Sequence, residues 1–250
     1  MSAADRAAVF RALHHGHSPG APLPLPEGRG RYPLVLPGPW DAASAKVLEE
    51  AGFPALATPS AGVSASLGYA DGELPADEMF AAVARIVRAV DVPVSADIER
   101  GYGLAPKEIV ERLLEAGAVG CNLEDSTPEG LKDPQEQADW LAEVRAAAGD
   151  RLFLNARVDT FVRGVGDPER AIERARLYVA AGADCVYPIM APPEVVPVLR
   201  ESIDGPLNVV ARPDSDLGRL GALGATRITF GPGLLKATMA QLNDLATGLR

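Results

Sequence analysis

Apolar residues follow two different spacings along this chain, and the two alternate over most of its length. Eight short apolar runs rich in β-branched residues indicate strands, at residues 34–38, 55–60, 93–99, 119–125, 152–159, 185–190, 207–212 and 227–231. Segments with helical periodicity lie between them, among them 41–52, 76–90, 105–117 and 168–182. Because parallel neighbouring strands need crossover connections, this repeat predicts an α/β fold, a parallel (β/α)8 TIM-type barrel. A doubly wound open sheet is the alternative, although no GxGxxG or GxxxxGK[ST] motif follows a strand.

Glycine residues mark the ends of several predicted helices. Gly52, Gly117 and Gly182 each follow an alanine at the end of a helical segment and precede a strand, and Gly224 follows a leucine in a similar place. Because glycine adopts positive φ without steric cost, we expect these residues to end their helices in the left-handed conformation.

The first 33 residues depart from the repeat. Residues 3–13 predict an extra N-terminal helix, and the Pro- and Gly-rich stretch after it predicts an irregular surface segment packed over one barrel end. We therefore interpret residues 1–250 as one barrel domain, with residues 1–33 as its N-terminal helix and surface segment. The three histidines, His14, His15 and His17, could form a metal site, but no carboxylate or cysteine lies nearby in sequence, which favours a solvated helix end.

The charge balance limits the kinds of partner. The 250 residues include 24 Lys and Arg against 34 Asp and Glu, a net charge of −10 that disfavours nucleic acid. No apolar run approaches the roughly 20 residues that span a bilayer, and the N-terminus lacks the apolar core of a signal peptide. We therefore expect no membrane partner and a cytoplasmic location. Cys121 and Cys185 lie in apolar strand-like runs, which favours reduced core thiols over a disulfide.

Polar residues occupy alternate positions near the ends of three predicted strands. Side chains two residues apart share one face of a strand, which groups Ser95 with Asp97 and Glu99, Asn122 with Glu124, and Asn155 with Arg157 and Asp159. If the apolar alternate positions meet the helices, these polar side chains line the barrel interior near its C-terminal mouth, where the catalytic residues of this fold lie.

This acidic cluster predicts a bound cation. Several carboxylates in a partly dry pocket need a compensating charge, and oxygen ligands with few direct carboxylates are typical of Mg2+. Arg157 adds a positive centre suited to a carboxylate or phosphonate. The alternative is that Arg157 and the acids pair with one another across strands.

In the order and spacing of several motifs, the chain resembles the isocitrate lyase/phosphoenolpyruvate mutase superfamily. The resemblance runs from about residue 34 to the C-terminus, and its motifs are LPGPWDAASAKVLEEAGFPALATPSAGVSASLGYADGE, SADIERGYG, GCNLEDS, and NARVDTF followed by ERAIERARLYVAAGADCVYP. It implies a (β/α)8 barrel, a homo-oligomer (dimer or tetramer) that exchanges its last helix between subunits, and Mg2+-dependent chemistry on 2-oxo or 2-hydroxy acids. Most members break carbon–carbon bonds, and a minority act on carbon–phosphorus bonds.

The resemblance also implies roles for individual residues. Asp97 matches the direct metal ligand, and Asp71, Glu99 and Glu124 match acids that hold the metal directly or through water.

Other matching positions concern the substrate, a small carboxylate or phosphonate. Ser60, Ala61 and Gly62 match the loop whose backbone amides bind its carboxylate. Arg157 matches the arginine that contacts the substrate, and Trp40 matches an aromatic lining residue, with a purely structural core position as the alternative.

The chain departs from the superfamily pattern after its Glu-Asp pair. Lyases of the superfamily carry a Lys-Lys/Arg-Cys-Gly-His gate there and mutases a Lys-Thr-Asn type gate, whereas this chain reads EDSTPEGLKDPQEQ. Glu99 also stands where better-known members have Asp. Lys132 and Tyr102 are candidates for the missing acid or base, which needs hydrogen-bond reach. Arg212 would add an anion contact if its side chain faces inward.

The sequence therefore predicts a Mg2+-dependent carbon–carbon lyase that acts on a small 2-hydroxy or 2-oxo carboxylic acid through a metal-stabilised enolate. Asp97 anchors the metal in this hypothesis, while Asp71, Glu124 and Arg157 are the candidate catalytic residues. One alternative is a phosphonate mutase or hydrolase, similar to carboxyvinyl-carboxyphosphonate or phosphoenolpyruvate phosphomutase. Another is a barrel that binds carboxylates and has no catalytic activity.

Overall fold

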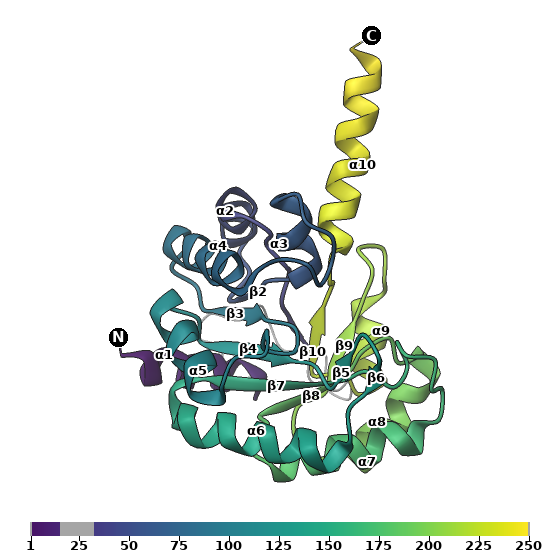
Figure 1. The fold of residues 1–250 in the computed structure, drawn as a ribbon. Helices are drawn as coiled ribbons and strands as arrows, with labels where there is room; N and C mark the ends of the chain where they lie inside the picture. Colours follow the sequence, from purple (N-terminus) through teal and green to yellow (C-terminus); the bar gives the residue numbers. More distant parts are fainter. Residues whose placement is uncertain (1, 16–32, 250) are drawn as a thin grey trace.

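The computed structural model describes residues 2–15 and 33–249, and in it eight parallel strands are surrounded by helices (Figure 1). The strands are β1 (Leu34–Val35), β2 (Leu56–Ala57), β3 (Val94–Asp97), β4 (Gly120–Leu123), β7 (Phe153–Val158), β8 (Cys185–Pro188), β9 (Asn208–Val210) and β10 (Arg227–Thr229). Each lies within one of the eight apolar runs, so the predicted strand–helix repeat is confirmed.

The strands form two parallel sheets that join at both edges. One has the order β2-β3-β4-β7-β8 and the other β1-β10-β9. A parallel bridge pairs Val186 with Leu207 between β8 and β9. On the other side the Ala57 amide donates to the Pro37 carbonyl at 3.1 Å, which connects β2 to the end of β1. The predicted barrel is therefore confirmed, and the open-sheet alternative is wrong.

Helices cover the outside of the barrel. They are α2 (Ala42–Glu50), α3 (Ser60–Ser66), α4 (Ala76–Ala89), α5 (Pro106–Ala116), α6 (Pro134–Ala148), α7 (Pro168–Ala180), α8 (Val196–Ser202) and α9 (Leu217–Ala222), with short 3-10 turns η1 (Gly149–Arg151) and η2 (Pro193–Val195). The predicted left-handed glycines are confirmed. Gly117, for example, ends α5 with φ 81°, and a Cβ there would lie 2.9 Å from the Val87 side chain.

The apolar core lies between the strands and these helices. Ala96 and Ile98 at β3 and Leu123 on β4 are buried in the same cluster as Ile109 of α5 and Leu141 of α6. Because successive strand residues point to opposite faces, the polar residues between these apolar ones face the barrel interior. The alternation of apolar and polar residues in the strands thus separates the residues that pack in the core from those that face the barrel interior.

The first helix, α1 (Ala3–His14), packs against the barrel beside β7 and η1. Its Phe10 ring lies 5.2 Å from the Phe153 ring of β7, and the His14 ring stacks on Phe153 at 4.1 Å. His14 is buried, so the interpretation of a solvated helix end is wrong for this residue. Helical spacing explains the error, because position 14 falls on the apolar face four residues after Phe10. The Pro- and Gly-rich segment and His17 lie outside the described residues.

The last helix, α10 (Gly233–Gly248), projects from the barrel as a single rod (Figure 1). Leu235 is its buried residue, whereas Met239, Leu242 and Leu245 are exposed. No helix in the described part of the chain is long and apolar enough to cross a membrane.

Candidate active site

A cavity of about 450 Å³ opens at the carboxyl ends of the barrel strands. Seven of the predicted site residues line it: Ser60, Ala61, Asp71, Asp97, Glu99, Glu124 and Arg157. Trp40 and Gly62 are not among the lining residues. They lie beside each other, since a Cβ on Gly62 would be 3.6 Å from the Trp40 Cβ. The role of Trp40 as a lining residue of the substrate site therefore stays a prediction.

The end of β3 supplies two of the carboxylates. Asp97 Oδ2 accepts hydrogen bonds from the Ser60 Oγ at 3.0 Å and from the Ser60 backbone N at 3.3 Å, while its Oδ1 accepts from the Glu99 backbone N at 3.3 Å. Glu99 itself adopts φ 53° and Tyr102 adopts φ 56°, both in the left-handed region. Such conformations are strained for non-glycine residues and are common at functional sites. The turn keeps both carboxylates at the cavity.

Arg157 is held by two acids at the cavity wall. Its Nε donates to Asp159 Oδ1 at 2.6 Å and its Nη2 to Asp159 Oδ2 at 3.0 Å, and its Nη1 forms an ion pair with Glu124. Each of its three nitrogens therefore already donates to a carboxylate. The alternative in which Arg157 and the acids pair with one another describes this arrangement.

Burial and mutual repulsion favour the protonated forms of the cavity carboxyls. Burial raises the pKa of Asp97, and burial together with the negative charges of Asp97 and Asp71 raises the pKa of Glu99. Burial and the charges of Asp97, Asp159 and Glu99 raise the pKa of Glu124 to about 8, against the opposing effect of Arg157. Five carboxylates line the cavity against three arginines, so acidic side chains outnumber basic ones there: Asp71, Asp97, Glu99, Glu124 and Asp159 against Arg100, Arg157 and Arg163.

The donor set fits a hydrated hard cation. Within residues 2–15 and 33–249, no three His, Cys, Asp or Glu side chains converge into a metal-holding group. Mg2+ keeps several of its waters and uses one or two direct carboxylates, so it does not require such convergence. The raised pKa values show that Asp97, Glu99 and Glu124 lie close enough to repel one another, and a divalent cation would relieve that repulsion.

The predicted amide loop begins α3, and most of its N–H groups already have partners. The Ser60 amide donates to Asp97, and the Gly62 amide donates to the Pro59 carbonyl at 3.1 Å. The Ala61 amide donates to no described residue. Of the three predicted backbone donors, Ala61 is the one available for a ligand.

The candidate acids and bases named from the sequence lie in different surroundings. Lys132 Nζ donates to Gln137 Oε1 at 3.0 Å and lies 5.0 Å from the centre of the Trp140 ring, and Lys132 is not among the residues that line the cavity. Tyr102 OH is 3.4 Å from Glu99 Oε1. Arg212 is exposed and pairs with Asp214, so the conditional anion contact is absent.

The segment that replaces the superfamily gate is a short antiparallel hairpin, β5 (Ser126–Thr127) and β6 (Gly130–Leu131). The buried Asp125 before it accepts hydrogen bonds from Tyr178 OH at 2.7 Å, Arg174 Nη1 at 2.9 Å and the Asp159 amide at 2.8 Å. Ser126 Oγ donates to Asp159 Oδ2 at 2.5 Å. The hairpin is therefore anchored to the barrel at its base.

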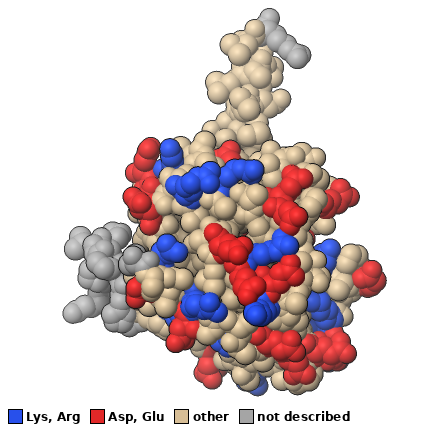
Figure 2. Space-filling view, turned by 60° about the vertical axis from the view of Figure 1, so that its left-hand side comes forward, with Lys and Arg blue, Asp and Glu red and all other residues tan. Residues whose placement is uncertain are grey.

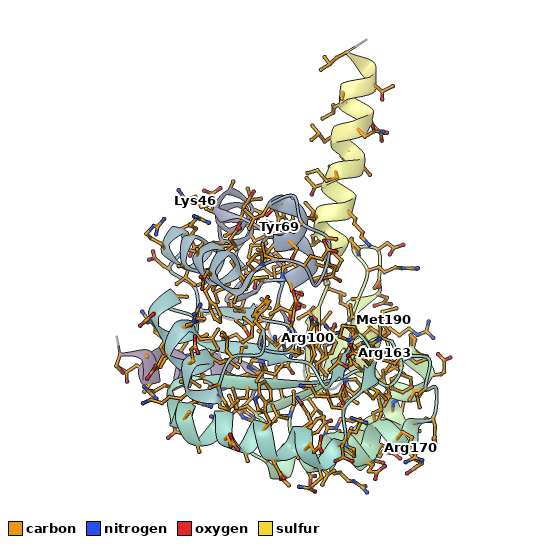
Figure 3. All side chains as sticks on the ribbon, viewed as in Figure 1. Lys46, Tyr69, Arg100, Arg163, Arg170 and Met190 are labelled. Atoms are coloured by element: carbon orange, nitrogen blue, oxygen red, sulfur yellow. The ribbon has the colours of Figure 1, made fainter. Side chains whose placement is uncertain are left out.

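Several residues that line the cavity are not among the site residues predicted from the sequence. They are Arg100, Ser126, Val162, Arg163, Tyr187, Met190 and Thr229. Figure 3 labels Arg100, Arg163 and Met190, which come from three different loops around the mouth. Loop residues carry no periodic signal, whereas Tyr187 shares the inward face of β8 with Cys185 and could have been found by alternation. On the face in Figure 2, acidic and basic side chains lie beside each other and neither sign covers the surface.

Comparison with known proteins shows the family to which the chain belongs. The model of the family described as phosphoenolpyruvate phosphomutase matches residues 10–250. An uncharacterized protein of Mycobacterium tuberculosis is 36% identical over 201 residues, which cover 80% of this chain and 78% of that protein. A 2-methylisocitrate lyase of Aeropyrum pernix is 36% identical over 62% of this chain and 53% of its own length. The chloroplastic carboxyvinyl-carboxyphosphonate phosphorylmutase of Arabidopsis thaliana is 35% identical over 62% of this chain and 50% of its own length.

Solved structures share the fold over nearly the whole chain. A phosphoenolpyruvate phosphomutase of Streptomyces platensis subsp. rosaceus superposes with a TM-score of 0.81 at 25% identity, covering 95% of this chain and 85% of that one. A phosphonopyruvate hydrolase in complex with oxalate and Mg2+ superposes with a TM-score of 0.83 at 22% identity, covering 100% of this chain and 87% of that one. The relatives thus include both lyases and phosphomutases.

Proposed function

The chain belongs to the phosphoenolpyruvate phosphomutase family, part of the isocitrate lyase/phosphoenolpyruvate mutase superfamily, and we propose that it is a Mg2+-dependent lyase. Its substrate in this proposal is a small 2-hydroxy or 2-oxo carboxylic acid, in which it cleaves a carbon–carbon bond. The proposal includes a cytoplasmic location, since Cys121 and Cys185 are buried free thiols.

The observation that carries the proposal is the group of buried carboxylates at the cavity. Asp97 and Glu99 at the end of β3 and Glu124 after β4 face one space, and each has a raised pKa. If these acids had only a structural role, each would be expected to pair with a basic side chain, yet Arg157 forms ion pairs only with Glu124 and Asp159. Asp97 has no ion-pair partner among the described residues, and Glu99 has only a 3.8 Å contact with Arg100. Carboxylates of this kind at an open cavity suit a metal-dependent enzyme.

Asp97, Glu99 and Glu124 would hold the ion, with Asp71 at the same cavity. A bound Mg2+ would supply the positive charge that stabilises negative charge developing on a substrate oxygen. The protein's own residues prepare the site. Ser60 holds the Asp97 carboxylate in place, and Arg157 does the same for Glu124.

Substrate orientation in this proposal depends on donors that the cavity leaves available. The Ala61 amide donates to no described residue and Ala61 lines the cavity, so this N–H can donate a hydrogen bond to one oxygen of a carboxylate ligand. The apolar side chains of Val162 and Met190 lie at the same cavity, where they can exclude water from the reacting groups.

A substrate panel tests the proposal. Purified protein is incubated with 2-hydroxy and 2-oxo diacids in the presence of Mg2+, and the release of pyruvate, glyoxylate or oxalate is measured. We expect Mg2+-dependent release from at least one diacid, and its loss in Asp97→Ala with an unchanged circular dichroism spectrum. Glu115→Ala, which removes an exposed carboxylate of α5, is the matched control and should keep full activity.

The same panel separates the alternatives. Turnover of phosphonopyruvate without carbon–carbon cleavage would assign a phosphonate mutase or hydrolase, in keeping with the similarity to the Arabidopsis phosphorylmutase. Mg2+-dependent binding of carboxylates without any turnover would leave a non-catalytic binding barrel.

A further inference from the structure

Arg227 is a buried arginine without an acidic partner. It lies on β10 with no exposed surface, 5.9 Å from the centre of the Phe10 ring and 6.0 Å from that of Phe153. Its Nε and Nη1 have no hydrogen-bond partner, and its Nη2 donates only to Asn122 Oδ1, at 3.4 Å. Within the described parts of the chain no carboxylate lies within ion-pair distance of it.

Such an arrangement is costly for the folded protein. A guanidinium stays protonated in proteins, and a buried charge without a partner is strongly unfavourable. Replacing buried ionic groups by apolar ones of similar volume is often neutral or stabilising. The buried Arg174 and the partly buried Arg157 each have a carboxylate partner. The rings of Phe10 and Phe153 give the Arg227 guanidinium cation–π contacts, but no carboxylate neutralises its charge.

The single hydrogen bond of Arg227 leads to the cavity. Asn122 lines the cavity, and its Oδ1 also accepts from Asn155 Nδ2 at 2.8 Å. Because a guanidinium can only donate, the Asn122 atom that faces Arg227 must be its oxygen. The Nδ2 of Asn122 donates to no described residue, so it is the atom left for a ligand in the cavity.

Other buried polar atoms of the barrel strands also have no hydrogen-bond partner. Asn208, opposite Arg227 in the β9–β10 register, has an unpartnered Nδ2, and Ser95 Oγ and Asn155 Oδ1 also lack partners. These residues are buried and are not among those that line the cavity. In such a poorly solvated interior, the Arg227 charge is screened less than it would be at the surface.

We propose that Arg227 is a positioning residue for anionic ligands of the cavity. It orients Asn122 so that the Nδ2 group donates to a ligand carboxylate, and its charge favours negative charge in the space that Asn122 lines. The inference rests on the proposed function, because it takes a carboxylate as the ligand. Arg227 need not touch that ligand.

Oxalate, titrated calorimetrically in the presence of Mg2+, is the probe. Arg227→Met should weaken oxalate binding by about tenfold or more, because it removes the group that fixes a donor to a charged ligand. Its melting temperature should equal or exceed that of the wild type, since the variant loses an unpaired buried charge. Arg227→Lys, which keeps the charge, should recover part of the affinity.

Two comparisons distinguish positioning from a structural role. Arg174→Met removes the buried partner of Asp125 and should lower the melting temperature clearly. In a double-mutant cycle, Arg227→Met should add little to the loss already caused by Asn122→Ala, because the arginine acts through that amide.

Each result has a definite meaning. If the wild type binds no oxalate with Mg2+, the proposed function fails and this inference fails with it. If the wild type binds oxalate and Arg227→Met binds it equally well, this inference alone is overturned. It is also overturned if Arg227→Met fails to fold or loses as much thermal stability as Arg174→Met, because the charge would then be a structural requirement.

Discussion

Arg157 of β7 forms an ion pair with Glu124, the residue that follows β4, so the pair bridges two neighbouring strands at the cavity. The same guanidinium grips Asp159 with two nitrogens, Nε at 2.6 Å and Nη2 at 3.0 Å. Glu124 therefore has a fixed orientation, whereas Arg157 keeps a carboxylate partner even when Glu124 is changed.

This relationship predicts the effect of Glu124→Gln. The variant keeps the shape of the side chain and removes one negative charge from the proposed Mg2+ site. We expect Mg2+ affinity to fall by about 10–100-fold, the usual effect of altering a group that tunes a metal site. Calorimetric titration of Mg2+ measures it, with Glu115→Gln on the exposed face of α5 as the control. Unchanged Mg2+ affinity in Glu124→Gln would count against a role for this acid at the metal.

The buried Asp125 predicts a stability effect at Tyr178. Tyr178 OH donates to Asp125 at 2.7 Å, and both residues are buried. A hydrogen bond to a charged group contributes about 1.5–3 kcal/mol, so Tyr178→Phe should lower the free energy of unfolding by that amount in urea denaturation.

Tyr69→Phe is the matched control for this substitution. Tyr69 OH also donates to a carboxylate, Glu78, at 2.5 Å, but this pair is exposed to water. Its loss should change the free energy of unfolding much less than the loss of the buried Tyr178 contact does. Equal effects of the two substitutions would show that burial does not strengthen the Asp125 contact.

The strands could be predicted because their two faces meet different surroundings. Ala96 and Ile98 pack against helices. Asp97 and Glu99, which alternate with them along the chain, line the cavity. This alternation of apolar and acidic residues can be recognised in the sequence. The same rule placed Glu124 and Arg157 at one cavity. Periodicity thus determines which residues face inward.

Periodicity does not determine which inward-facing groups bind each other. The sequence predicts that Arg157 contacts the substrate, and in the structure its three nitrogens bind Glu124 and Asp159. These contacts depend on the distance between neighbouring strands. Arg163 and Met190 reach the cavity from loops, and Met190 does so with φ 61°. Loop paths depend on tertiary contacts, which a single sequence does not display.

The projecting helix α10 predicts self-association. Met239, Leu242 and Leu245 recur along one side of it and are 45%, 54% and 69% exposed. The superfamily resemblance implies a homo-oligomer that exchanges its last helix, and burial of these side chains on a second copy would remove them from water. Light scattering after size-exclusion chromatography should therefore report a dimer or tetramer.

A pair of double variants tests the role of that helix. Leu242→Glu with Leu245→Glu should reduce the measured mass to that of the monomer, because two charges would have to be buried in the interface. Gln241→Glu with Asn243→Asp adds the same charge on the same helix and should keep the oligomer. A monomeric wild type would contradict helix exchange.

His14 predicts that stability falls in acid. Its Nδ1 lies 2.8 Å from the Phe10 carbonyl and so carries the proton, while its Nε2 is buried without a partner. Burial, and then the positive charge of Arg227, lower the pKa of His14 to about 3. Between that value and the ordinary pKa near 6.5, the unfolded chain binds a proton that the folded protein rejects.

Unfolding is therefore favoured as the pH decreases through that window, and the contribution of His14 is fully present only above about pH 6.5. One such group changes the free energy of unfolding by about 1.4 kcal/mol per pH unit. Urea denaturation at pH 7.0 and 5.5 should show a larger loss of stability in the wild type than in His14→Leu, which keeps an apolar side chain against Phe153 and cannot titrate. Because the cavity carboxyls are the same in both proteins, their effects cancel in this difference. An equal pH dependence in the two proteins would mean that His14 accepts a proton in the folded state as readily as in the unfolded chain.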